Sequence, residues 1–391
     1  MTNVLLNPTD LADGNIRIDA FCYQIDTSGT VINDLTPYFV QADSQVERDS
    51  CATEDAATAR LNFIFTPEDI QSLFGQDTVP WSSMRLRPEV QINGTGEPIE
   101  LGVFLPETPR LVADKYPLEF QVDCHDLIHA LAEPTNGTVV LPGGATIGLE
   151  ISSIFSPDFA QLVAPPPSMN VSQDIFNIPT PTKSARQWVI HENTTWLLII
   201  DQLLESAGYL PPWTDRRGNL VSEEWVDPSA KPPELILTDA SRTSNIALGA
   251  STRDDTYGVP NEFTFIATDF DPENTETPVL GNGIVKRSNL DRGPASQNVR
   301  GRVVASVQYV DAADQASLEL IADREFLRSV TPARTLCLDI APQPLPWHRG
   351  IVEVTISDLG IEREKYMVRS WTLPLDGADA NLVMDKIDGV L

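Results

Sequence analysis

The sequence is poor in cysteine, and its cysteines are not spaced for metal or redox chemistry. Its 391 residues include four cysteines, and no two of them have CxxC spacing. The sequence therefore predicts neither a zinc knuckle nor a disulfide framework. Because free cysteine is among the most buried residue types, we expect all four to be small buried hydrophobic residues: Cys22, Cys51, Cys124 and Cys337.

Long apolar runs are also missing. No stretch approaches the roughly 18 apolar residues that a membrane-spanning helix needs, and no charged-then-apolar leader opens the sequence. We therefore expect a chain without a membrane span or a secretory signal, which folds in a cytoplasm.

Basic residues are scarce relative to acidic ones. The chain has 27 Lys and Arg against 56 Asp and Glu, which gives a formal net charge of −29. Such a field opposes sequence-independent binding to phosphate backbones and to anionic lipid, because these carry the same sign. The composition thus argues against DNA as a tightly held ligand, whereas DNA that slides past without sticking is compatible with it.

Motifs for catalysis and nucleotide binding are absent as well. The chain has no GxSxG elbow, no GxxxxGK[ST] phosphate loop and no GxGxxG after a strand. Adjacent acidic pairs such as Glu223-Glu224, which a glycosidase would need, are expected by chance among 56 acidic residues. We therefore predict no catalytic residue and no cofactor.

Histidines and acidic loops do not combine into a metal site. His125 and His129 are spaced i, i+4, but no HExxH motif or third ligand accompanies them. The acidic segment 269–275 resembles a calcium loop but lacks the glycine at position six and the glutamate at position twelve. We expect no metal site, a solvated loop at 269–275, and structural roles for His191 and His348.

The most informative segment that is present runs from Met84 to Val122. Apolar and polar residues alternate through it in three stretches, with a glycine-rich turn at 93–96 and a polar turn from Pro109 to Lys115. A period of two residues is typical of half-buried strands. The segment therefore predicts an antiparallel meander with one dry face.

A second, weaker copy of this pattern lies near the C-terminus. The first copy opens at Ala59-Arg60 and the second at Ala333-Arg334, and each continues through a Pro-Trp corner into further strands. A β-barrel used twice in one chain indicates a ring or tube component more than a catalyst. The aromatic residues that we assign to barrel cores or seams are Trp81, Trp347, Phe104 and Phe120.

Two helices are predicted between the copies. Residues 195–207 place apolar side chains on one helical face, with Asn193 or Thr194 as cap and Gly208 as the stop. A second helix is expected at 312–329, with Asp311 as its N-cap. The residues that we expect to pack the first helix are Trp196, Ile200, Leu203 and Leu204.

The predicted fold class is α+β, mainly β, with two antiparallel β-barrel domains and α+β insertions. Residues 1–125 are expected to be wholly β and to form the first barrel. Residues 126–234 form an α+β domain. Segments 235–268 and 333–391 form a discontinuous second barrel, and 269–332 is an insertion. Within these units, the residues expected to be irregular are a polar crossing at 252–256 and a surface excursion at 267–304.

The order of these pieces resembles the tail hub proteins of long-tailed bacteriophages, also called baseplate hub or minor tail proteins. The resemblance rests on four loose motifs whose order and spacing span most of the chain. They are RLRPEVQINGTGEPIELGVFLPETPRLV followed by EFQVDCHDL, TTWLLIIDQLLESAGY with its DRRGNL turn, VPNEFTFIA, and ADREFLRS leading to KYMVRSWTLPL.

The resemblance implies a homotrimer in which each subunit contributes two tube-type β-barrels to a pseudo-sixfold ring. It implies a virion protein of the tail tip, assembled in the host cytoplasm, that joins the sixfold tail tube to the threefold tip. The partners implied are a distal tail or tail-tube hexamer, a tape-measure protein, and a central fibre or other tip proteins. DNA would leave through the lumen without specific binding, and we expect that lumen to be electronegative and neighbouring edge strands to pair.

Two alternatives remain open from the sequence. One is a carbohydrate-binding or carbohydrate-cleaving β-protein, for which acidic pairs and aromatic side chains would form the site. The other is a distal tail or tail-tube protein, which predicts a single barrel per chain and six copies. Counting the β-modules in the fold distinguishes the second alternative from a hub.

Overall fold

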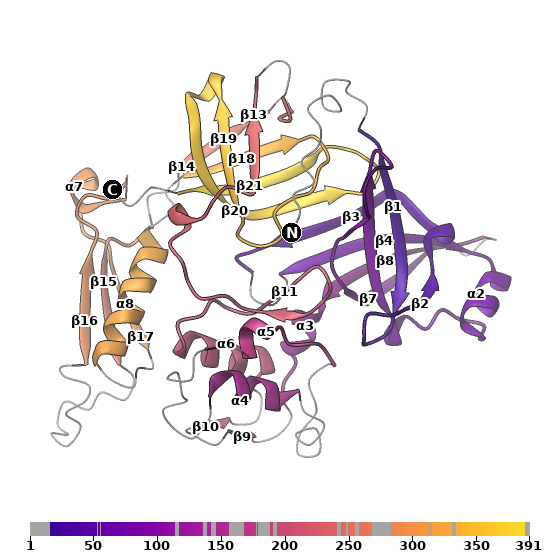
Figure 1. Cartoon of the computed structure of the whole chain (residues 1–391), viewed down its shortest axis with the longest axis horizontal. Coiled ribbons are helices and arrows are strands. Elements are labelled where there is room, and N and C mark those ends of the chain that lie inside the picture. The colour runs from indigo at the N-terminus through magenta and orange to yellow at the C-terminus, as the bar shows by residue number, and fades with distance from the viewer. Residues whose placement is uncertain are drawn as a thin grey trace.

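We describe a computed structural model of the chain. The residues that it describes are 16–52, 54, 56–113, 117–135, 139–141, 146–155, 168–176, 178, 188–190, 194–240, 244–247, 249–254, 258–267, 283–293, 295–310, 312, 315–330 and 334–387. The fold is mainly β with helical insertions, and a large, mostly antiparallel sheet of 14 strands is its centre. Figure 1 shows this sheet crossing the molecule from its N-terminal strands to its C-terminal ones.

The N-terminal module is the part of this sheet made by the first strands of the chain. Its strands alternate buried and exposed side chains, because one face covers the core. The strands pair in the order β3-β4-β8-β7-β5-β1-β2, with β6 beside β5. Their bounds are β1 Ile18–Ile25, β2 Val31–Asp34, β3 Phe39–Asp49, β4 Ala57–Phe65, β5 Arg85–Ile92, β6 Ile99–Glu100, β7 Phe104–Ala113 and β8 Leu118–Asp126.

The C-terminal module is made by two segments on either side of an insertion. Its strands pair in the order β14-β18-β21-β20-β19-β13, and β13 runs parallel to β19. The buried side chain of Asn245 donates to the carbonyl of Ile236 and accepts from the N–H of Thr238, which ties the segment before β14 to β13. The bounds are β13 Leu235–Thr238, β14 Ser251–Asp254, β18 Arg334–Ile340, β19 Ile351–Ile356, β20 Ile361–Pro374 and β21 Ala380–Lys386.

The two modules are joined and are not separate barrels as expected. Strand β3 pairs with β4 on one side and with β20 on the other, so the pairing continues from one module into the next. Their apolar faces form one continuous core. Among the described residues, the strand order runs from β14 to β2 without closing on itself.

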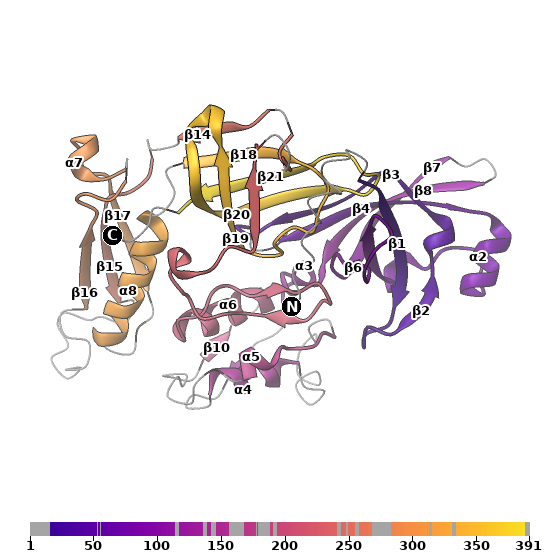
Figure 2. The same cartoon turned by 45° about the horizontal axis from the view of Figure 1, so that its top comes forward.

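A helical unit packs beneath the joined modules (Figures 1 and 2). Its core gathers the apolar faces of α3, α4 and α6 together with Ile25 and Val103 of the N-terminal module. Thr195 caps α6, and Gly208 at φ +82° ends it. The elements are α3 Leu127–Leu131, β9 Val139–Leu141, α4 Ile147–Ile154, α5 Gln173–Phe176, β10 Trp188–Ile190, α6 Trp196–Ser206, β11 Trp213–Thr214 and β12 Leu220–Val221.

A small α+β unit projects from the C-terminal module (Figure 2). It has a three-stranded sheet in the order β16-β15-β17, and α8 covers one face of it through Leu318, Ile321 and Ala322. The elements are β15 Glu262–Ala267, β16 Ile284–Ser288, α7 Gln297–Arg300, β17 Ala305–Val310 and α8 Gln315–Val330.

Several predicted boundaries were wrong for identifiable reasons. The first 125 residues are not wholly β, because Thr66 and Asp69 form a capping box that starts helix α2 at Pro67–Phe74. The first residues of the turn expected from Pro109 to Lys115 are strand, since β7 continues to Ala113 and proline is tolerated on a sheet edge.

Further boundaries of the prediction also differ from the structure. Residues 252–254 are in β14, which is polar because it is an exposed edge strand. Strand β15 was expected in the second barrel but pairs with β16 and β17, and the excursion at 267–304 contains β16 and α7. The α6 cap is Thr195, one residue after the predicted Thr194. The predicted positions Asn193, His191, Asp311 and 269–275 lie outside the described residues.

Candidate functional site

The joint between the modules is an antiparallel pairing of β3 with the second half of β20. Its register runs from Ser370 opposite Asp49 to Pro374 opposite Gln45. Backbone bonds continue past both ends, since Ser50 N donates to Arg369 O at 2.7 Å and Leu375 N donates to Ser44 O at 2.8 Å. Residues more than 300 positions apart in the chain thus share one hydrogen-bonded ladder.

The two modules are copies of one strand arrangement. The order β3-β4-β8-β7-β5-β1 of the N-terminal module corresponds to β14-β18-β21-β20-β19-β13 of the C-terminal module. They differ at the last pair, where β1 runs antiparallel to β5 but β13 runs parallel to β19. The two Pro-Trp corners precede corresponding strands, β5 and β19.

The correspondence extends to single residues. Pro109 of β7 pairs with Val122 of β8, and Trp371 of β20 pairs with Leu382 of β21. Each ladder has a bulge at the same place, between Pro106 and Thr108 in β7 and between Val368 and Ser370 in β20. A bulge is a specific local feature, so its recurrence shows a structural repeat that can be matched residue by residue.

A buried polar cluster lies where both modules meet the helical unit. Arg48 of β3 is within 3.9 Å (Nη1 to Oδ2) of Asp126, which caps α3, and both side chains are almost completely buried. Asp126 also accepts hydrogen bonds from the Thr214 hydroxyl at 2.7 Å and from the Ile128 N–H at 3.2 Å. One carboxylate therefore connects the N-terminal module to β11 and α3.

Trp347 brings the C-terminal module into this cluster. Its indole N–H donates to the carbonyl of Thr214 at 2.6 Å. The guanidinium groups of Arg48 and Arg216 lie 4.7 and 4.9 Å from the centre of its rings, which are distances for cation–π attraction. The neighbouring His348 stacks on Trp213 at 4.3 Å and contacts Arg48 Nη2 through Nδ1 at 3.3 Å.

Burial shifts the charged groups of this cluster toward their neutral forms. It lowers the pKa of Arg48 to about 10, against an opposing effect of Asp126, and it lowers the pKa of Arg216 to about 10 as well. Burial raises the pKa of Asp126 although Arg48 counteracts it. Burial and then the nearby Arg48 lower the pKa of His348 well below its usual range, so this imidazole is neutral at pH 7.

The four aromatic residues predicted for cores or seams occupy two places. Trp81 and Phe120 pack against each other at 5.6 Å, beside Phe65, at the far end of the N-terminal module. Phe104 is fully buried, and a Cβ on Gly102 would meet both its ring and that of Trp347. Trp347 alone of the four takes part in the polar cluster.

The predicted helix-packing residues lie together in the helical unit. Trp196, Ile200, Leu203 and Leu204 are all buried in its core, where α3 and α4 contribute many of the other apolar side chains. These residues hold the unit together, and no polar group of the cluster above comes from α6.

The remaining candidates from the sequence have ordinary surroundings. Cys22 and Cys124 are buried and Cys337 is half-buried, but Cys51 is exposed, contrary to expectation. His125 and His129 stack at 4.3 Å beside Glu107. Within the described part of the chain, no group of His, Cys, Asp and Glu is arranged to hold a metal ion, and no helix is long and apolar enough to cross a bilayer.

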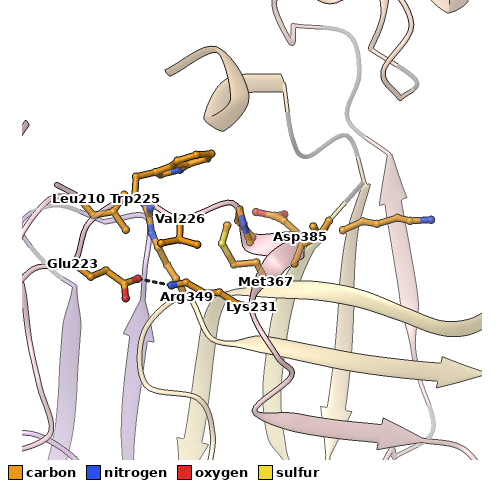
Figure 3. A pocket seen from close by; sticks show the side chains of 11 residues that line it. Leu210, Glu223, Trp225, Val226, Lys231, Arg349, Met367 and Asp385 are labelled. Carbon is orange, nitrogen blue, oxygen red and sulfur yellow. Dashed lines mark hydrogen bonds and ion pairs between the residues drawn. The ribbon is translucent and has the colours of Figure 1, made fainter. Parts of the chain in front are cut away.

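A cleft lies between the segment 210–231 and strands β20 and β21 (Figure 3). Val226, Met367 and Ile387 line it, and Glu223 and Lys231 form an ion pair of 2.6 Å at its wall. Its volume of about 60 Å³ is well below the roughly 300 Å³ of the smallest usual ligand pockets. The hollow is too small for a substrate of ordinary size.

Sequence reasoning missed Arg48, Asp126, Thr214 and Arg216. Each stands in a short polar stretch that is typical of solvent, and only the meeting of three units buries it. The available signal was weak. Arg48 lies two residues after Val46 in strand β3, so that its side chain points to the same buried face.

Comparisons with known proteins find solved structures that share this architecture. No protein-family model and no curated protein sequence matches the chain. A tail protein from Neisseria meningitidis is similar in structure over 94% of this chain and 96% of its own, with a TM-score of 0.63 and 14% identity. The 43 kDa tail protein of prophage MuSo2 from Shewanella oneidensis is similar over 95% of this chain and 100% of its own, with a TM-score of 0.59 and 13% identity.

The likeness extends to a chain of a protein complex. The Francisella PdpA–VgrG complex contains a chain with a TM-score of 0.54 and 12% identity, over 98% of this chain and 56% of that one. At these identities the likeness shows the fold alone. This chain therefore has the fold of phage tail proteins, and a chain of the PdpA–VgrG complex shares it.

Proposed function

We propose that this chain is a structural subunit of a bacteriophage tail tip, the hub ring that joins the sixfold tail tube to the threefold tip. The observation that carries the proposal is the residue-level repeat, in which two copies of one β-module stand side by side in one chain. Three such chains supply six similar modules. A homotrimer can then meet a hexamer on one side and a threefold object on the other.

The fold supports this role over the alternatives from the sequence. Tail proteins with this fold match nearly the whole chain and nearly their own whole lengths. A distal tail or tail-tube protein would need one module per chain, whereas two are present. A carbohydrate site would need a groove with converging reactive groups, whereas the cleft beside β20 and β21 has a volume of about 60 Å³ and its acidic Glu223 is paired with Lys231.

We propose the two joined β-modules as the tube-type units of the ring, and the helical unit and the small α+β unit, which takes β15 from the expected second barrel, as insertions. The proposed partners are a tail-tube or distal tail hexamer, the tape-measure protein, and a central fibre or other tip proteins. The net charge of −29 supports a lumen that repels phosphate, so that DNA leaves without binding.

The copy number and symmetry of the chain in intact particles test the proposal. Quantitative mass spectrometry against the tail-tube protein, with cryo-electron microscopy of the tail end, should find three copies at the tip and an acidic channel. Six copies along the tail would favour the tube alternative. A continuous basic lining, or a location away from the tail, would overturn the hub assignment.

A further inference from the structure

The joint inside one chain shows which strand edges of a module meet their neighbour. Strand β20 has β21 along one side, and on its other side it has β19 along its first half and β3 along its second half. The second half of β20 is thus the edge that accepts the next module. Strand β3 is the edge that the next module presents.

The N-terminal module has the same accepting edge without a partner strand. Strand β7, the copy of β20, pairs with β8 along its length but with β5 only at Phe104. Within the described residues no strand pairs with the remainder of that edge. Leu111 is 47% exposed there, whereas Leu373 at the corresponding place in the joint is 3% exposed. Val112 is 54% exposed.

The C-terminal module has the matching presented edge. Strand β14, the copy of β3, pairs with β18 on one side only, within the part of the chain that the structure describes. Residues 251–253 are exposed, whereas Val46 at the corresponding place in β3 is fully buried. Each chain therefore has one strand edge on each module that matches one side of the joint, β7 on the N-terminal module and β14 on the C-terminal module.

We propose that β7 of one copy pairs antiparallel with β14 of a second copy of this chain, in the register that β20 and β3 use within one chain. The partner at each edge is a second copy of the chain, because the joint within one chain already shows the second half of β20 paired with β3, and β7 and β14 are the copies of these two strands. The inference rests on the proposed ring, in which every module must meet two neighbours. It adds the strands and the register of the contact between subunits.

The register follows from the residue correspondence. The pair Trp371–Arg48 of the joint corresponds to Pro109 opposite Asp254 between two copies. The pair Thr372–Glu47 corresponds to Arg110 opposite Arg253. Leu373 opposite Val46 becomes Leu111 opposite Thr252, so Leu111 would be covered as Leu373 is.

Proline gives this edge selectivity. In an antiparallel ladder every second residue pair is hydrogen-bonded. Because Arg369 and Leu375 are hydrogen-bonded to Ser50 and Ser44, the residues between them at every second position, Trp371 and Leu373, also belong to hydrogen-bonded pairs. Pro109 stands at the first of these places and has no N–H to donate. A free edge with proline resists indiscriminate strand addition, so the contact accepts a partner whose other contacts make up for the missing bond.

Disulfide trapping tests the register. The full chain carries Arg110→Cys and Arg253→Cys, with exposed Cys51 replaced by Ser. These positions form a non-hydrogen-bonded pair in the proposed contact, with Cα atoms about 4.5 Å apart, which suits a disulfide. The control pairs Thr108→Cys with Arg253→Cys, which the same register puts about 7–8 Å apart, too far to bridge. Circular dichroism checks that both variants fold.

The outcomes separate this inference from the proposed function. Oxidation of the first variant should give covalent species that stop at three copies, with at least tenfold less product from the control. Species that continue beyond three copies support the contact but overturn threefold closure. No more product than the control overturns the β7–β14 contact, whatever the copy number in particles.

A charge exchange gives a second readout. Arg110 and Arg253 face each other in the proposed register, and like charges directly opposite weaken a strand pair. Arg110→Glu should therefore tighten self-association by roughly two- to fivefold, measured by sedimentation velocity. The double variant Arg110→Glu, Arg253→Glu should return to the wild-type level. A gain in the double variant equal to or above that of the single one contradicts the register.

Discussion

Breaking the Arg48–Asp126 pair should destabilise the protein far more than breaking an exposed pair of better geometry. Arg48 Nη1 and Asp126 Oδ2 are 3.9 Å apart, with side-chain exposures of 0% and 2%. The exposed pair Arg60–Asp123 is shorter, at 3.0 Å, with exposures of 49% and 48%. Distance alone would rank the exposed pair first.

Burial reverses this ranking. At about 4 Å and an effective dielectric constant of about 20, two unit charges attract by about 4 kcal/mol. Removing them from water costs several kcal/mol each. The pKa of Arg48 falls to about 10 and that of Asp126 rises, so burial outweighs the attraction for both groups. Each charge is tolerated because the other is present.

The two single variants should therefore each be strongly destabilised, and the double variant should lose much less stability than the sum of their losses. Arg48→Met leaves Asp126 without its cation, and Asp126→Asn leaves Arg48 without its anion, so each should lower the free energy of unfolding by about 3–5 kcal/mol. The double variant should lose about as much as one single variant or less. The coupling energy should then be about 3 kcal/mol or more.

Urea unfolding followed by tryptophan fluorescence and far-UV circular dichroism measures these differences. Arg60→Met and Asp123→Asn are the matched controls on β4 and β8, and each should cost below about 1 kcal/mol. Equal losses from the buried and exposed pairs would refute the reasoning, as would a double variant whose loss is the sum of the two single ones.

Three further predictions concern the same cluster. Trp347→Phe removes the indole N–H that donates to Thr214 and should cost about 2 kcal/mol more than Trp81→Phe at the repeated corner; equal unfolding midpoints would contradict this. Because the pKa of His348 is depressed in the folded protein, stability is fully present above pH ~6.5 and is lost below it by up to about 1.4 kcal/mol per pH unit. His348→Phe, which keeps an aromatic ring over Trp213, should remove that slope in a series of melts between pH 7.5 and 5. Gly102→Ala would place a Cβ 3.0 Å from Phe104 and 3.1 Å from Trp347, so it should cost about 1–3 kcal/mol more than Gly96→Ala, which meets nothing; calorimetry that ranks Gly96→Ala as the worse variant would reject the packing argument.

The sequence by itself determined several of the elements and indicated the repeat. Alternation of apolar residues predicted the strands between Met84 and Val122, and a helical period predicted α6 almost to its ends. Two Pro-Trp corners marked the copies. These features follow from local chemistry, because side-chain direction has a period of two residues in a strand and 3.6 in a helix.

Only the tertiary structure decided that the two copies share one sheet and where charge is buried. The pairing of β3 with β20 depends on which edges meet, and an edge has no signature in the order of its side chains. Arg48 and Asp126 look like solvent-exposed residues until three units close over them. The polar strand β14 and the proline-containing β7 were misjudged for the same reason, since a strand edge is defined by the neighbour that it lacks.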